Sequence, residues 1–121
     1  MQSESELIAG LKELAADVGP EGLAEIVELF LGDSADLVRA LRTAGELGDA
    51  AGVARAAHAL KSTAATVGAG ELSARCMEME RLGRAGLLRE AIPQLPEVEA
   101  EYSHVRTLLG ALKSRVETAN L

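Results

Sequence analysis

The sequence predicts an all-α protein: an antiparallel, up-down four-helix bundle with an additional short N-terminal helix. Aromatic residues make up only 2% of the chain, so the core must come from aliphatic side chains, a composition that favours packed helices over a sheet. Apolar residues recur every three or four positions along most of the chain. The short connections between these stretches predict antiparallel neighbours. A length of 121 residues suits a single bundle domain spanning residues 1–121.

The N-terminal helix begins with a capping signal. Ser3 and Glu6 have the spacing of a capping box, and an apolar stripe follows at Leu7, Leu11 and Leu14. We expect this short helix to end near residues 18–19. Pro20 then occupies a position that suits the first turn of the next helix.

The second helix is predicted to be long, over residues 21–47. Only Ser34 interrupts its apolar stripe, which is formed by Leu23, Ile26, Val27, Phe30, Leu31, Leu37, Val38 and Leu41.

Three more helices follow. Asp49 is the expected N-cap of a helix over residues 50–67, and a fourth helix is predicted over residues 71–84. A proline is costly inside a helix beyond its first turn, so the last helix either begins near Pro96 or is kinked there. Its regular part is predicted over residues 97–117.

Composition and charge exclude several classes of function. A net charge of −7 disfavours binding to nucleic acid and to acidic membrane surfaces. Cys76 is the only cysteine, so no internal disulfide is expected, which is typical of a reducing compartment. The chain has neither an apolar run of membrane-spanning length nor the basic and apolar pattern of a signal peptide. We therefore expect a cytoplasmic protein, and the starting methionine and full set of helices favour a stand-alone one.

His58 is the residue most informative about function. It lies within the predicted third helix, whose apolar arc is made of Val53, Leu60, Ala64 and Val67. At about 100° per residue, that arc lies roughly opposite His58. Most of its helical neighbours are small, so its imidazole should stand clear of the helix and be accessible to a large partner. By periodicity alone, an ordinary surface histidine remains the alternative.

A longer motif gives His58 a chemical meaning. The segment HALKSTAATVGAGELSARCMEME runs from His58 to Glu80 and resembles the histidine-containing phosphotransfer (HPt) domain of two-component phosphorelays. Eight positions carry this resemblance at the family's spacing: His58, Leu60, Lys61, Ser62, Gly68, Leu72, Cys76 and Glu80.

The resemblance implies a phosphocarrier. His58 would accept a phosphoryl group on Nε2 from the aspartate of a receiver domain and relay it reversibly to another receiver domain. The partner would be the receiver domain of a response regulator or of a hybrid histidine kinase. That domain would supply Mg²⁺, so this chain needs no metal or cofactor of its own. We expect a monomer and no enzymatic activity beyond phosphotransfer.

The same resemblance implies supporting roles near His58. Lys61 would pair with phosphoryl oxygens, and the alternative is a solvated lysine. Ser62 stands where many family members have glycine, leaving room for a partner's loop and adding a hydroxyl. Glu80 would accept a hydrogen bond from Nδ1 of His58 and fix the ring's tautomer, and the alternative is a rim glutamate paired with an arginine.

Two other hypotheses make different predictions. A helical adaptor without phosphate chemistry would bind receiver or kinase domains regardless of His58. An enzyme in its own right would need a nucleotide or metal site, for which the sequence gives no motif. Cys76 lies on an inward stripe and is predicted to be a buried, inert thiol, and His104 is expected on the surface.

Overall fold

The computed structural model describes residues 1–118 and 120–121. Its first element, α1, spans Glu4–Glu46, and the hydroxyl of Ser3 accepts the Glu6 backbone N–H at its start. Gly19 leaves the helical conformation, with φ 77° and ψ 169°. The two predicted N-terminal helices are therefore two arms of one kinked element, and Pro20 begins the second arm.

The remaining elements lie close to their predicted ranges. They are α2 (Ala50–Thr66), α3 (Gly70–Arg84), α4 (Leu88–Ala91), the 3₁₀ helix η1 (Ile92–Gln94) and α5 (Leu95–Glu117). The helices α4 and η1 were not foreseen. Pro93 and Pro96 fall at the starts of η1 and α5, where a missing N–H breaks no helical hydrogen bond.

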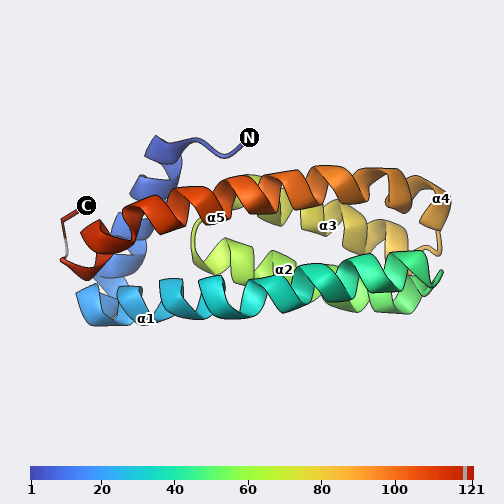
Figure 1. Cartoon of the computed structure of the whole chain (residues 1–121), viewed down its shortest axis with the longest axis horizontal. Coiled ribbons are helices and arrows are strands. Elements are labelled where there is room, and N and C mark those ends of the chain that lie inside the picture. The colour runs from blue at the N-terminus through green and yellow to red at the C-terminus, as the bar shows by residue number, and fades with distance from the viewer. Residues whose placement is uncertain (119) are drawn as a thin grey trace.

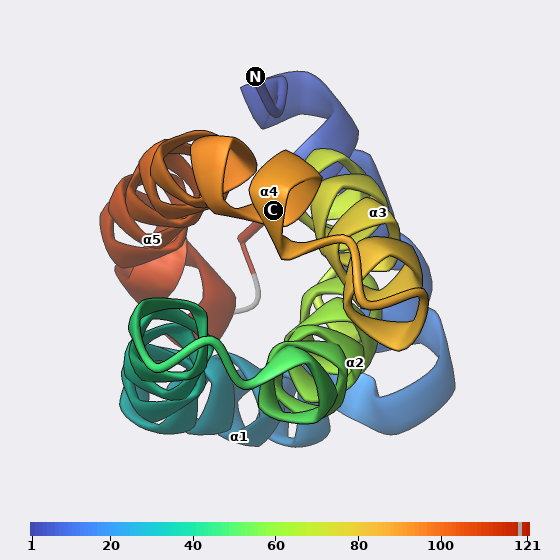
Figure 2. The ribbon, with the colours of Figure 1, turned by 90° about the vertical axis from the view of Figure 1, so that its right-hand side faces the viewer.

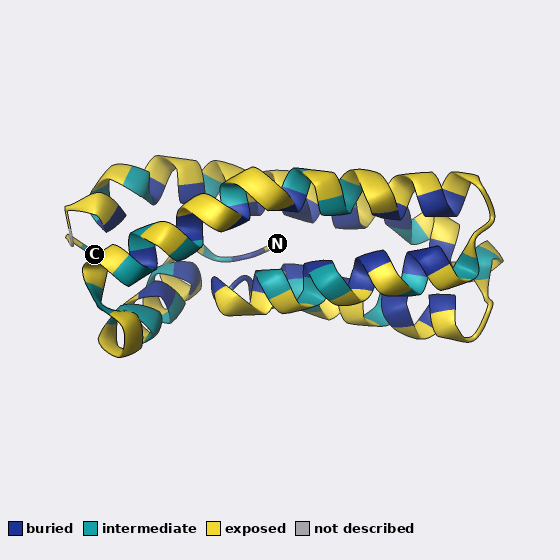
Figure 3. Cartoon of the chain, turned by 90° about the horizontal axis from the view of Figure 1, so that it is seen from below, coloured by how far each residue is buried: buried dark blue, intermediate teal, exposed yellow. Residues whose placement is uncertain are grey.

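The long helices form the predicted four-helix bundle. The second arm of α1, together with α2, α3 and α5, runs along the long axis, and the first arm crosses one end (Figure 1). Seen end-on, these helices occupy the four corners of a square, and consecutive long helices are neighbours (Figure 2). Buried residues line the inner faces and exposed residues the outer ones (Figure 3). No helix within residues 1–118 is both long and apolar enough to cross a bilayer.

Ser34, which interrupts the apolar stripe of α1, is fully buried. Its hydroxyl donates to the Phe30 carbonyl and lies 3.0 Å from the hydroxyl of Tyr102 on α5. The core thus satisfies its buried serine by pairing it with a tyrosine on the facing helix.

Gln2, which precedes α1, is hydrogen-bonded to both α3 and α5. The backbone N–H of Gln2 donates to Glu101 Oε2 at 3.0 Å, and His104 Nε2 lies 2.7 Å from the Gln2 carbonyl oxygen. The side-chain oxygen of Gln2 accepts the Glu71 backbone N–H at 3.2 Å, in the first turn of α3. His104 is therefore half-buried and hydrogen-bonded, not an ordinary surface residue as expected.

Candidate functional site

His58 lies on the outer side of α2. The apolar residues that the sequence placed opposite it, Val53, Leu60, Ala64 and Val67, are all buried. The His58 side chain itself is 57% exposed. Its helical neighbours Ala51, Ser62 and Ala65 are also exposed, and their small side chains leave the ring accessible.

Glu80 on α3 holds one edge of the His58 ring. Its Oε2 lies 2.8 Å from His58 Nδ1, and its side chain is only 6% exposed. Two contacts bring α3 close to α2 at this level: Ser73 Oγ donates to the Lys61 carbonyl at 3.1 Å, and Gly83 packs directly against the backbone of Ala54.

Two cations share the same carboxylate. Lys61 Nζ donates to Glu80 Oε1 at 2.7 Å, while Arg84 Nη2 lies 2.6 Å from Oε2, the oxygen that also faces His58. Lys61, expected to be available to phosphoryl oxygens, is thus held by Glu80. The sequence left open whether Glu80 contacts the His58 ring or pairs with an arginine. In the structure it does both.

Arg84 was not singled out from the sequence. Its position four residues after Glu80 on one helix was the available signal, because residues at this spacing are neighbours on a helix surface.

The electrostatics of the cluster fix the tautomer of His58. Lys61 and, after it, His58 and Arg84 lower the pKa of the Glu80 carboxyl, and they outweigh the effect of its burial. Glu80 is therefore an acceptor-only carboxylate at neutral pH. Because it can only accept, Nδ1 of His58 must donate, and in the neutral ring the lone pair then belongs to Nε2.

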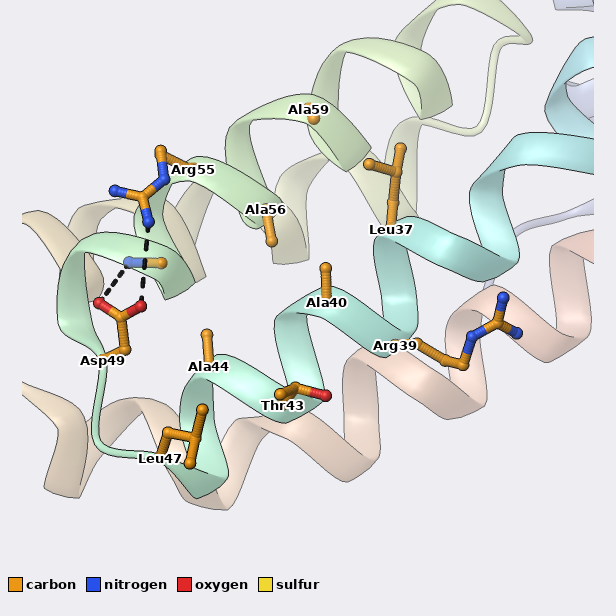
Figure 4. Close-up of a pocket in the computed structure, with 11 residues that line it drawn as sticks. Leu37, Arg39, Ala40, Thr43, Ala44, Leu47, Asp49, Arg55, Ala56 and Ala59 are labelled. Carbon is orange, nitrogen blue, oxygen red and sulfur yellow. Dashed lines mark hydrogen bonds and ion pairs between the residues drawn. The ribbon is translucent and has the colours of Figure 1, made fainter.

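A groove between α1 and α2 adjoins the His58 side of the bundle. It has a volume of about 660 Å³ and is lined mainly by small and aliphatic side chains. In Figure 4, Leu37, Ala40 and Ala44 of α1 face Ala56 and Ala59 of α2 across it.

No group of three or more histidine, cysteine or acidic side chains that could hold a metal ion is found among residues 1–118 and 120–121. Cys76 is buried, as predicted, and burial raises the pKa of its thiol to about 12.

Comparison with known proteins places this geometry in a family. Residues 25–114, which include the whole of the His58 motif, match the Hpt domain. The chain belongs to the Hpt domain family. The structure of histidine-containing phosphotransfer protein B (HptB) from Pseudomonas aeruginosa PAO1 is similar to this Hpt domain, with a TM-score of 0.82 and 29% identity, covering 88% of this chain and 92% of that one.

Two curated relatives agree with the Hpt assignment. Phosphorelay protein LuxU of Vibrio cholerae is 30% identical over 79% of this chain and 79% of its own length. Histidine-containing phosphotransfer protein 2 of Arabidopsis thaliana is 30% identical over 82% of this chain. This Hpt domain spans only 65% of the length of the Arabidopsis protein.

Proposed function

We propose that this chain is a histidine phosphotransfer protein of two-component signalling that carries the phosphoryl group on Nε2 of His58. The observation that carries the proposal is the ring's orientation: Nδ1 is bound to a buried carboxylate, and the ring is more than half exposed. The names of its relatives, histidine-containing phosphotransfer and phosphorelay proteins, support the same chemistry.

The transfer step follows from this geometry. The Nε2 lone pair attacks the phosphorus of an aspartyl phosphate on the partner, the P–N bond forms, and the P–O bond to the carboxylate breaks. The released electron pair stays on the aspartate. Since Nδ1 keeps its proton, the ring gains positive charge, and the Glu80 carboxylate 2.8 Å away compensates it. The reverse step returns the phosphoryl group to a receiver aspartate.

The partner we propose is the receiver domain of a response regulator or hybrid kinase. Such a domain would sit over α2 with Ala54, Ser62 and Ala65 beneath it, and the neighbouring groove would offer it apolar surface. We further propose that residues 1–121 act as one monomeric domain in the cytoplasm and as a carrier without turnover chemistry of its own. The lone cysteine supports a reducing compartment.

Phosphotransfer from phosphorylated receiver domains of the host tests the proposal. Wild type and His104→Gln should accept label equally, because His104 on α5 contacts the Gln2 carbonyl and not His58 or Glu80. His58→Gln should remain folded by circular dichroism and accept none. Undiminished labelling of His58→Gln would refute the assignment. Receiver binding that is retained by His58→Gln, with no transfer by the wild type, would instead indicate the adaptor.

A further inference from the structure

A small cavity lies beside His58 on the side towards the start of α2. Its volume is about 230 Å³, and it is lined by Ala54, Arg55, His58 and Arg84. Two of its four lining residues are therefore arginines, in a protein whose net charge is −7. Neither arginine has a role in the transfer step described above.

Arg84 brings positive charge that Glu80 does not neutralise. The single negative charge of Glu80 faces two side-chain cations, Lys61 on one oxygen and Arg84 on the other. The side chains around Glu80 therefore hold a surplus of positive charge beside His58. The Arg84 side chain is 68% exposed, and a guanidinium has five donors, so it has donors left for a further oxyanion.

Arg55 approaches the same cavity from α2. Its Nη2 lies 3.8 Å from Asp49 Oδ2, and its side chain is 73% exposed. Figure 4 shows Arg55 reaching back over the start of α2 towards Asp49. The other oxygen of Asp49 accepts the Gly52 backbone N–H at 2.9 Å as the N-cap of α2. Because 3.8 Å is too long for a hydrogen bond and both groups are exposed, this ion pair is easily exchanged.

We propose that Arg55 and Arg84 form an oxyanion site beside His58, here called the arginine notch, that binds the phosphoryl group once it is on Nε2. The inference rests on the proposed function and extends it. By binding the product of the first transfer, the notch shifts the equilibrium between phosphorylated His58 and the partner's phosphoaspartate towards this protein.

The charges favour such a site. A phosphoryl group carries close to two negative charges and three acceptor oxygens at neutral pH. Arginine matches it better than lysine does, because its planar fork donates two parallel hydrogen bonds. Glu80 keeps its own charge at neutral pH and stays bound to the ring. The incoming dianion therefore needs positive charge that Glu80 does not neutralise, and Arg55 and the surplus charge of Arg84 supply it.

The test compares Arg55→Gln, Arg84→Gln and the double variant with wild type, and Arg81→Gln serves as the matched control. Arg81 is exposed on the same helix but pairs with Glu78, away from the cavity. The equilibrium with a phosphorylated receiver domain should shift towards the receiver by about two- to fivefold for each notch variant, the range of exposed ion pairs. The shift should shrink at high salt, and Arg81→Gln should show none.

Two further measurements separate the possible failures. Labelling of free protein by phosphoramidate, a small phosphodonor, needs no partner, and the phosphorus NMR shift of the phosphohistidine should move in the notch variants only. The nitrogen-15 spectrum should show that His58 keeps its proton on Nδ1 in every variant. Loss of that proton in Arg84→Gln would mean that Arg84 acts through Glu80, which would overturn its place in the notch.

The remaining outcomes are equally decisive. If wild type labels on His58 but the equilibrium is the same in all variants, the notch is refuted while the proposed function stands. If the notch variants change only the affinity of unphosphorylated protein for the receiver, the arginines bind an acidic side chain of the partner, which also refutes it. If wild type is not labelled on His58 at all, the proposed function itself has failed.

Discussion

Gly83 on α3 and Ala54 on α2 are in direct backbone contact. A Cβ added at Gly83 would lie 2.8 Å from the Ala54 nitrogen and 3.0 Å from the Ala50 carbonyl oxygen, both rigid parts of α2. The contact lies one turn from His58 on α2 and one turn from Glu80 on α3. The distance between imidazole and carboxylate thus depends on the absence of a side chain at Gly83.

Gly83→Ala should therefore weaken both stability and the site. Forcing α3 away from α2 should lower the free energy of unfolding by about 1–3 kcal/mol, the usual cost of overpacking, and should lengthen the His58–Glu80 contact. Urea denaturation and the Nδ1–H signal of His58 would measure the two effects. Gly110→Ala on α5 is the control, since a Cβ there would meet no neighbouring part of the protein within 4 Å. It should stabilise the protein by about 0.5–1 kcal/mol. Equal stability changes in the two variants would contradict this account.

The stability contributed by Glu80 should disappear in acid. Its pKa in the folded protein is lowered, first by the Lys61 hydrogen bond, so the carboxylate stabilises the fold above its ordinary pKa of about 4.5. That contribution is lost as the pH falls through the lowered pKa. Wild type should be more stable than Glu80→Gln at pH 7, and the difference should narrow below about pH 4.5. Urea midpoints between pH 3 and 7 would show this, and exposed Glu13→Gln provides the comparison for loss of a surface charge.

The Cys76 thiol should be inert in the native protein. Burial raises its pKa from 9.0 to about 12, so the thiolate is roughly a thousandfold scarcer than in an exposed cysteine at pH 8. In the native protein, iodoacetamide should modify Cys76 only as fast as the protein unfolds. In the urea-unfolded protein, the same reaction should be fast. Rapid native labelling would show that α3 opens locally.

The hydrogen bond between Gln2 and the buried Glu101 should contribute to the stability of the protein. This residue is 1% exposed and accepts the Gln2 backbone N–H. Glu101→Leu should lower the free energy of unfolding by about 1–3 kcal/mol, because that N–H loses its acceptor. Glu101→Gln retains an acceptor oxygen and should cost less. Thermal melts of both variants test this, and a Gln variant as unstable as the Leu variant would argue that the charge, not the hydrogen bond, matters.

The sequence by itself determined which side of each helix faces the core. The burial of Leu60 and Ala64 and the exposure of His58 follow from a period of 3.6 residues, a local property of the chain. The start of α1 at Ser3 and the break at Gly19 were readable for the same reason, because capping and glycine conformations involve only a few adjacent residues.

Only the tertiary structure decided what meets His58. Glu80 contacts its ring from another helix, and Arg84 binds the same carboxylate. Both contacts depend on the position of α3 along α2 and on how closely the two helices pack, as the backbone contact at Gly83 shows. Likewise, no local pattern joins Gln2 to Glu101, ninety-nine residues away. Such distances are set by the packing of two helices together, so they belong to neither stretch of sequence alone.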